Sequence, residues 1–159
     1  MPKLNVVNLA PELLERGFWL YVWKIALPDG SFVHYVGMTG DTVPKNGAQS
    51  AFKRIADHLG VNKNSNQLRK YLSHRHVSPE QCRSLNFFAF GPIGKVPKDP
   101  AEYSRERGKI AALERSLCMW LRKGGYVVLH KDPGTRFAHG EEDWNEVRAA
   151  LRGHFPAAV

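Results

Sequence analysis

One carboxylate of this 159-residue chain, Glu114, stands where packing alone would favour an apolar side chain. It lies in the segment 103–123, whose apolar residues recur with helical spacing: Ile110, Leu113, Leu117, Trp120 and Leu121. At about 100° per residue, Glu114 falls inside the edge of this apolar stripe. A buried carboxylate is costly unless it is ion-paired, hydrogen-bonded or bound to a metal ion. We therefore predict that Glu114 is either a structural residue, whose carboxylate reaches the surface or forms a salt bridge, or a metal ligand.

An arginine and a histidine, Arg54 and His58, stand four residues apart in the segment 46–59, "NGAQSAFKRIADHL". The segment is typical of a helix, and its expected buried stripe is Phe52, Ile55 and Leu59. Residues four apart are neighbours on one side of a helix. We therefore expect Arg54 and His58 to project together from a different face.

Two strand-like segments, 17–27 and 31–37, are separated by "PDG", and this loop decides how the strands pair. Pro28 has its φ fixed at about −65°, so it does not fit a type I′ turn, which needs positive φ at both central positions. The loop suits a type I turn followed by Gly30 in the left-handed conformation. This combination predicts a three-residue hairpin loop.

The three-residue loop places two tyrosines, Tyr21 and Tyr35, on one face of the hairpin. Trp23 then faces Tyr35, and Tyr21 faces Gly37. The tyrosines become diagonal neighbours with backbones roughly 7 to 8 Å apart, whereas a two-residue loop would put them on opposite faces. Gly37 is expected to leave the space above it open, because it has no side chain.

The rest of the chain predicts one small domain. We expect a third strand over 84–93, a short helix over 66–74 capped by Asn66, a long helix over 103–123 ended by Gly124 and Gly125, a short strand over 126–130 and a terminal helix over 141–154. The length fits a single domain, 1–159, with a core over about 18–133 and terminal extensions over 1–17 and 134–159. The predicted fold is α/β of the α+β type. It has a small, mainly antiparallel three-stranded sheet flanked by helices, with extra N- and C-terminal helical segments.

The positive charge of the chain predicts an anionic partner. The net charge is +8 and the sequence pI is about 9.7. Residues 45–75 hold one acidic residue, Asp57, against these basic residues: Lys45, Lys53, Arg54, Lys63, Arg69, Lys70 and Arg75. Solvated helix faces explain many such segments, and a nucleic-acid backbone is the sharper interpretation. We predict that DNA contacts Lys53, Lys63, Arg69 and Lys70.

Other features argue against several classes of protein. No apolar run approaches the length of a membrane span, and the first 17 residues do not resemble a secretory leader. Cys82 and Cys118 have no zinc or redox spacing, which favours a reduced, cytoplasmic compartment. His74 and His76 are two residues apart, so on a helix their rings point apart, and a zinc site there is disfavoured. We expect a cytoplasmic protein with no membrane partner.

Four short stretches occur in a fixed order: "LYVWKI", "YVG", "KRIADH" and "ALERSL". In this order the chain resembles the GIY-YIG nuclease family, which includes homing and restriction endonucleases and the incision domains of nucleotide-excision repair. The resemblance covers about residues 18–133. It matches Tyr21 to the tyrosine that ends the first motif, Tyr35 to the tyrosine that opens the second, and Gly37 to the glycine of the second.

The resemblance also implies roles for residues on the two helices. Arg54 matches the arginine of the family, His58 the histidine or tyrosine one turn later, and Glu114 the carboxylate that binds a divalent metal. Two positions depart from the pattern. Trp19 stands where the first motif has glycine. His130 stands near the asparagine that supports the family's site, where it either replaces the asparagine in contacting the substrate or has no role.

Together, the resemblance and the residue chemistry predict metal-dependent hydrolysis of DNA. A Mg²⁺ or Mn²⁺ ion on Glu114 is expected to polarise the phosphate and stabilise the leaving oxygen. Arg54 is expected to hold the phosphate and offset transition-state charge. Tyr21 or Tyr35, aided by His58, is expected to take the proton of the attacking water. An unperturbed tyrosine titrates at about 10, so this role requires a nearby positive charge, from Arg54 or the metal.

The competing interpretation is a non-catalytic nucleic-acid-binding module on the same fold. The departures at Trp19 and His130 favour it. Such a module need not bind Mg²⁺ or Mn²⁺, and its affinity for DNA would survive EDTA. Recognition or dimer contacts are expected in residues 1–17, in the 92–102 loop and in the terminal helix. The sequence leaves both a monomer and a homodimer open.

Overall fold

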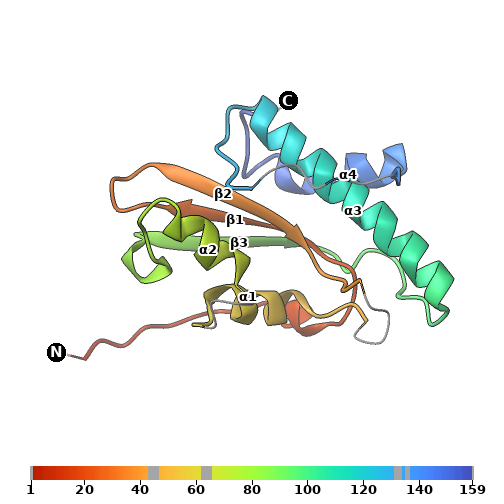
Figure 1. Cartoon of the computed structure of the whole chain (residues 1–159), viewed down its shortest axis with the longest axis horizontal. Helices are drawn as coiled ribbons and strands as arrows, with labels where there is room; N and C mark the ends of the chain where they lie inside the picture. The colour runs from red at the N-terminus through yellow and green to blue at the C-terminus, as the bar shows by residue number, and fades with distance from the viewer. Residues whose placement is uncertain (1, 43–46, 62–65, 131–133, 135–136, 159) are drawn as a thin grey trace.

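The computed structural model describes residues 2–42, 47–61, 66–130, 134 and 137–158, and a three-stranded antiparallel sheet lies at its centre (Figure 1). The strands are β1 (Leu20–Ala26), β2 (Phe32–Met38) and β3 (Ser84–Phe90), in the order β2-β1-β3. Because β1 is the middle strand, it pairs on both sides and is buried along most of its length. The predicted α+β class with a small antiparallel sheet is confirmed.

Helices cover both faces of this sheet (Figure 1). The described residues form α1 (Ala51–Leu59), α2 (Gln67–Ser73), α3 (Pro100–Lys123) and α4 (Glu141–Leu151), with the short 3₁₀ turns η1 (Pro11–Leu14) and η3 (Pro79–Gln81). The helices α1 and α2 pack on one face, and α3 and α4 pack on the other. None of these described helices is long and apolar enough to cross a membrane.

Successive residues of β1 face two separate hydrophobic cores, as the two-residue period of a strand requires. Leu20 and Val22 point into the core shared with α3 and α4. Tyr21, Trp23 and Ile25 point into the core shared with α1 and α2. This alternation carries Tyr21 toward α1, the helix that bears the predicted arginine and histidine.

The β1–β2 hairpin has the predicted three-residue loop. Gly30 adopts a φ of 90°, and its amide donates to the Leu27 carbonyl at 2.9 Å. Tyr21 consequently pairs with Gly37, as predicted. Tyr21 and Tyr35 therefore share the face that packs toward α1 and α2.

The space above Gly37 is filled by the Tyr21 ring, so the prediction that it is open is wrong. A methyl group on Gly37 would overlap the phenol ring. We expect Gly37→Ala to lower the free energy of unfolding by about 1 to 3 kcal/mol, because overpacking forces the ring to move. The matched control is Gly153→Ala, since a methyl group there meets no neighbour within 4 Å. Equal urea midpoints for the two variants would contradict this account of Gly37.

The face that α1 buries also differs from the predicted one. Phe52 is 38% exposed, so the predicted buried stripe is wrong at this position, and Ile55 and Leu59 are only half-buried. His58 is the buried residue, with its ring edge-on to Tyr21. Ile55 and Leu59 still pack against the core shared with the sheet, and the buried face of α1 also includes His58 because aromatic side chains of β1 and β2 surround the imidazole.

Several predicted boundaries shift. α1 begins later than predicted because the Ser50 side chain caps it, and α3 begins one turn earlier because Asp99 caps it. Residues 126–130 do not form the predicted strand, since a single bridge joins Val128 to His34. The N-terminal segment contains the 3₁₀ turn η1 in place of the expected helical segment.

The C-terminal segment belongs to the packed body of the protein. Val147 and Leu151 of α4, and Phe155 after it, lie in the core that α3 also lines. The core therefore extends beyond residue 133, where the sequence predicts the start of a C-terminal extension.

Candidate active site

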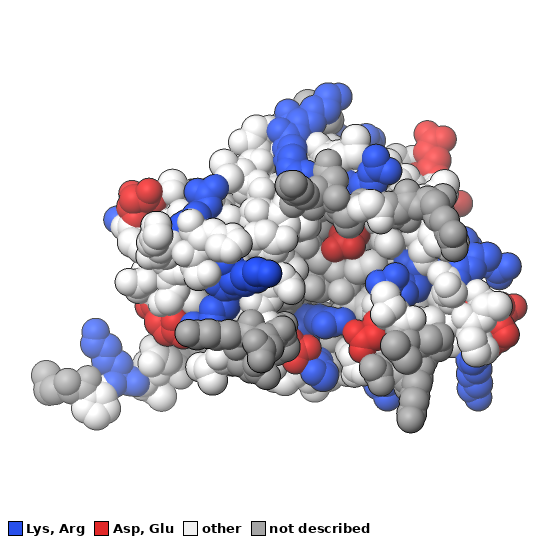
Figure 2. Space-filling view, viewed as in Figure 1, with Lys and Arg blue, Asp and Glu red and all other residues white. Residues whose placement is uncertain are grey.

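A cleft of about 440 Å³ opens beside the edge strand β2, between α1 and α3. All five side chains predicted to be catalytic line it: Tyr21, Tyr35, Arg54, His58 and Glu114. Figure 2 shows this face of the molecule hollowed between the two helices, with lysine and arginine side chains around the hollow. The fold thus brings residues of β1, β2, α1 and α3 to one place.

The Tyr21 hydroxyl and His58 Nε2 lie 2.9 Å apart, within hydrogen-bond distance. Phe87 stacks on Tyr21 with a centroid separation of 5.2 Å, which fixes the phenol ring. Burial, with a smaller effect from the Arg54 charge, lowers the pKa of His58 to about 4. His58 is therefore neutral at pH 7. Its Nε2 can accept a proton from Tyr21, and its buried Nδ1 has no hydrogen-bond partner among the described residues.

Burial holds both cleft tyrosines in their neutral form. It raises the pKa of Tyr21 and of Tyr35 above the usual value, and the Arg54 charge, which lowers both, has the smaller effect. The expectation that Arg54 brings a tyrosine toward ionisation is therefore not met. The hydrogen bond to His58 offers another route, because a tyrosine that passes its proton to a neutral imidazole need not exist as a free anion.

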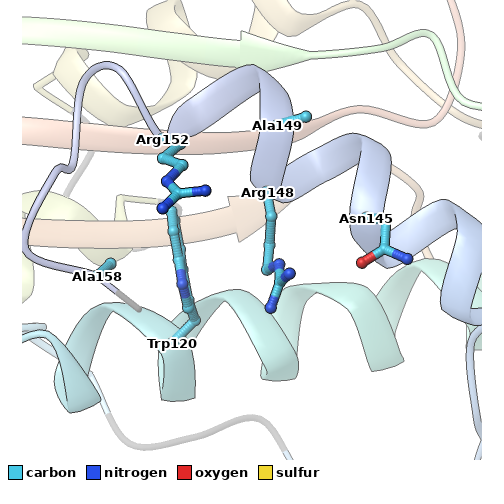
Figure 3. Close-up of a pocket in the computed structure, with 6 residues that line it drawn as sticks. All are labelled: Trp120, Asn145, Arg148, Ala149, Arg152 and Ala158. Carbon is cyan, nitrogen blue, oxygen red and sulfur yellow. The ribbon is translucent and has the colours of Figure 1, made fainter.

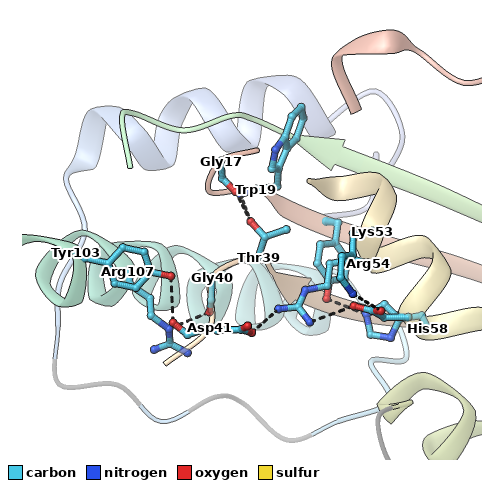
Figure 4. Close-up of polar contacts among 12 residues, drawn as sticks. Gly17, Trp19, Thr39, Gly40, Asp41, Lys53, Arg54, His58, Tyr103 and Arg107 are labelled. Atoms are coloured by element: carbon cyan, nitrogen blue, oxygen red, sulfur yellow. Dashed lines mark hydrogen bonds and ion pairs between the residues drawn. The ribbon is translucent and has the colours of Figure 1, made fainter. Parts of the chain in front are cut away.

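Arg54 is held between two carboxylates at the wall of the cleft (Figure 4). Its Nη2 donates to Asp41 Oδ1 at 3.2 Å, and its Nη1 lies 3.7 Å from Asp57 Oδ2. Its Nε is buried and has no partner among the residues that the structure describes. The two carboxylates orient the planar guanidinium before any substrate enters, and this geometry suits binding of phosphate oxygens.

Glu114 lines the same cleft from α3 and is half-buried. Burial raises the pKa of its carboxyl group to about 7, against the opposing charges of Arg107 and Arg54. Its carboxylate has no hydrogen-bond or ion-pair partner within the described ranges of the chain. The alternative of a salt-bridged structural glutamate therefore finds no support there.

The groups around Glu114 fit a hydrated Mg²⁺ or Mn²⁺ ion rather than a closed metal cage. Among the described residues, no cluster of three or more His, Cys, Asp or Glu side chains could hold a metal. Mg²⁺ typically keeps several waters and binds through one or two carboxylates plus substrate phosphates. One carboxylate without a protein partner, facing a cleft of this size, meets that requirement.

The raised pKa of Glu114 predicts a pH dependence of stability. Its folded-state pKa of about 7 exceeds the unfolded value of about 4.3. The folded protein therefore keeps this proton at higher pH than the unfolded chain does. The resulting stability is fully present below about pH 4 and is lost as the pH rises toward 7.

We expect Glu114→Gln to raise the free energy of unfolding relative to wild type by on the order of 1 to 2 kcal/mol at about pH 8. The difference should vanish at about pH 4, where both side chains are uncharged. Urea melts of the two proteins at both pH values provide the measurement. A difference that does not change with pH would contradict the burial of this carboxylate.

Three other charged residues of the cleft, Arg107, Asp41 and Asp57, were not predicted as site residues from the sequence. Arg107 Nε donates to the Gly40 carbonyl at 3.0 Å, and the Tyr103 hydroxyl donates to the Asp41 carbonyl at 3.1 Å (Figure 4). In this way α3 holds the turn after β2 against the cleft. The sequence does place Arg107 on the same face of the helix as Glu114, because it stands two helical turns before Glu114. Asp41 has no comparable signal.

The predicted DNA-contacting residues are dispersed. Gly37 lines the cleft. Lys53 is exposed and pairs with Asp57 at 2.7 Å, and Lys70 is exposed on α2. Lys63, like Lys45, lies outside the described residues. Of the described residues in this set, only Gly37 lines the cleft, and the contacts of Lys53 and Lys70 with DNA stay predictions.

Arg69 is engaged within the protein. It makes a forked contact with Glu80, with N–O distances of 3.1 and 2.7 Å, and donates to the carbonyls of Leu59 and Gly60. These carbonyls lie at the end of α1, so Arg69 ties that helix end to η3. To bind a phosphate, Arg69 would have to release these partners, and we therefore assign it a structural role.

His130 lies behind the cleft, against Tyr35. Their ring centroids are 4.9 Å apart, and His130 Nε2 is 3.5 Å from Cys118 Sγ. Arg122 donates to its backbone carbonyl. Burial lowers the pKa of His130 to about 4. The described residues that line the cleft do not include His130, so its position suits support of Tyr35 better than the predicted contact with the substrate.

Comparisons of the chain with protein families, with curated proteins and with solved structures found no match. The geometry of the cleft and the order of the sequence motifs therefore carry the functional conclusion.

Proposed function

We propose that this chain is a metal-dependent DNA endonuclease of the GIY-YIG type, with a GIY-YIG-like fold, that hydrolyses phosphodiester bonds. The observation that carries the proposal is that five side chains from four separate sequence motifs line one cleft: Tyr21, Tyr35, Arg54, His58 and Glu114. The net charge of +8 supports a polyanionic substrate.

Proton transfer is assigned to the pair of Tyr21 and His58. The Tyr21 oxygen takes a proton from the attacking water while its own proton passes to the neutral His58 Nε2. The hydroxide that is formed bonds to phosphorus, and the bond between phosphorus and the leaving ester oxygen breaks. Tyr35 lines the same cleft and helps to orient the water.

The negative charge that develops on the phosphate is stabilised by two arginines of the cleft. Arg54 and Arg107 donate to phosphate oxygens and balance the negative charge of the transition state. Glu114 would hold the Mg²⁺ or Mn²⁺ ion, which when bound polarises the phosphate and stabilises the leaving oxygen. Asp41 and Asp57 keep the guanidinium of Arg54 in place throughout the reaction.

Metal-dependent cleavage distinguishes this function from a non-catalytic DNA-binding module. We expect a labelled duplex to give shorter products with the protein in Mg²⁺ or Mn²⁺, and none in EDTA. Binding of the duplex with the same affinity in all three solutions, and with no product in any of them, would contradict the proposal and favour the binding module.

A further inference from the structure

A second groove, of about 320 Å³, lies between α3 and α4. Trp120 of α3 lines one side of it. The other lining residues are Asn145, Arg148 and Ala149 of α4, Arg152 directly after α4, and Ala158 near the C-terminus. Figure 3 shows Asn145, Arg148 and Arg152 pointing from α4 toward α3, with the Arg152 guanidinium beside the Trp120 indole. Among the described residues, the groove and the cleft described above share no lining residue.

The groove residues Asn145, Arg148, Ala149 and Arg152 share one solvent-exposed face of α4. This face lies beside the apolar face of Val147 and Leu151, which packs in the core. Here Ala149 stands among one amide and two guanidinium groups. Arg148 and Arg152 are one turn apart, where like charges repel each other.

Neither arginine has an ion-pair partner in the part of the chain that the structure describes. The acidic residues of α4 lie mainly in its first turn, where they complement the helix dipole: Glu141, Glu142 and Asp143. The helix therefore separates its charges and leaves two guanidinium groups at the groove without a counter-charge. An anion that enters the groove would relieve their repulsion.

The donors in the groove suit a phosphate group. Guanidinium groups bind phosphate oxygens through paired N–H donors, and the Asn145 amide adds a neutral donor on the same face. We propose that this groove binds one phosphate of a DNA backbone, at a distance from the scissile bond.

Two exposed basic residues lie on the side of α3 between the groove and the cleft. At about 100° per residue, Glu114 and Trp120 point to different sides of α3, and the solvent-exposed side lies between them. Arg115 and Lys123 are exposed on that side. A DNA strand that leaves the cleft across α3 would therefore meet positive charge before it reaches the groove. The inference rests on the proposed function in one respect, namely that DNA is the substrate.

The test is the salt dependence of duplex binding, measured by fluorescence anisotropy in EDTA so that no cleavage occurs. The double variant Arg148→Ala/Arg152→Ala should bind more weakly, because it no longer neutralises the phosphate in the groove. The slope of the logarithm of its binding constant against the logarithm of the salt concentration should become less negative by about 0.9, which is the contribution of one neutralised phosphate. Its melting temperature should not fall, because the substitution removes a repulsion.

Two control variants distinguish a specific phosphate site in the groove from non-specific electrostatic attraction between the protein and DNA. Arg148→Lys/Arg152→Lys keeps both charges and loses the forked donors, so it should keep the wild-type slope and lose affinity. Arg83→Gln removes one charge at the β1–β2 turn, where Arg83 donates to the Pro28 carbonyl, and should leave the slope unchanged. A wild-type slope in the double alanine variant, or an equal change in Arg83→Gln, would overturn the proposal.

The same variants distinguish failure of this inference from failure of the proposed nuclease. At saturating DNA, the double alanine variant should cleave at the wild-type rate, because the groove lies outside the cleft. A flattened slope in a protein that cuts no DNA would refute the nuclease and keep the groove. A melting-temperature increase with a free mononucleotide that requires both arginines, together with an unchanged DNA slope, would overturn the proposal and assign the groove to a small ligand.

Discussion

The Glu114→Gln variant is expected to cleave DNA more slowly than wild type by a factor of about 10³ or more. Glutamine keeps the shape of the side chain and removes the charge that would hold the divalent ion. Loss of the ion removes several kcal/mol of transition-state stabilisation, and each 1.4 kcal/mol corresponds to about a factor of ten. Affinity for DNA should persist, because the basic surface is unchanged. Single-turnover cleavage and anisotropy on one labelled duplex measure the two quantities.

The matched control for this variant is Glu106→Gln. Glu106 lies on the same helix, pairs with Lys109 at 2.8 Å and does not line the cleft among the described residues. Its replacement should leave the cleavage rate within a factor of about two, because a surface ion pair contributes little. Wild-type rates for Glu114→Gln, or equal losses for both variants, would show that Glu114 is not a metal ligand.

Tyr21→Phe is expected to lower the cleavage rate by a factor of about 10² or more, because it removes the hydroxyl that links the water to His58. His58→Gln should have a similar effect. If the two side chains act in one proton relay, the double variant should be no slower than the slower single variant. Tyr35→Phe should have a smaller effect, since the bond to His58 is made by Tyr21.

This interpretation requires Tyr21→Phe to lower the cleavage rate without a matching loss of stability. Tyr21→Phe removes one hydrogen bond, so the free energy of unfolding should change by about 1 kcal/mol or less. Tyr126→Phe is the control, because it also removes one hydrogen bond, from the Ala157 amide, outside the cleft. It should cut at the wild-type rate. Multiplicative losses in the double variant of Tyr21 and His58 would contradict a shared relay.

The fold was predictable where local rules dominate. The loop of Pro28 and Gly30 determines the hairpin register, because the conformations of proline and glycine do not depend on distant contacts. The exposure of Phe52 and the burial of His58 on α1 were not predictable in this way. Phe52 is exposed and His58 is buried because aromatic residues of β1 receive the imidazole, which is a tertiary contact. Residues 126–130 have side chains typical of a strand, but they form a single β-bridge, between Val128 and His34.

The candidate site was predictable where a residue breaks its local pattern. Glu114 interrupts an apolar stripe, and Arg54 with His58 shares one side of a helix, so each could be singled out. Asp41 could not, because its place depends on how α3 packs against the turn after β2, whereas Arg107 could be placed only on the same helix face as Glu114. The raised pKa values of the tyrosines also depend on burial, which the sequence does not specify.

The central claim, that this cleft hydrolyses DNA phosphodiester bonds, is tested most directly with supercoiled plasmid. Wild-type protein and Glu114→Gln are incubated with it side by side in Mg²⁺, in Mn²⁺ and in EDTA, and both proteins are first shown to be folded. We predict nicked or linear plasmid with wild type in Mg²⁺ or Mn²⁺, and supercoiled plasmid in every other sample. Plasmid that stays supercoiled with the wild-type protein in both metals, or that the variant converts at the wild-type rate, would contradict the claim.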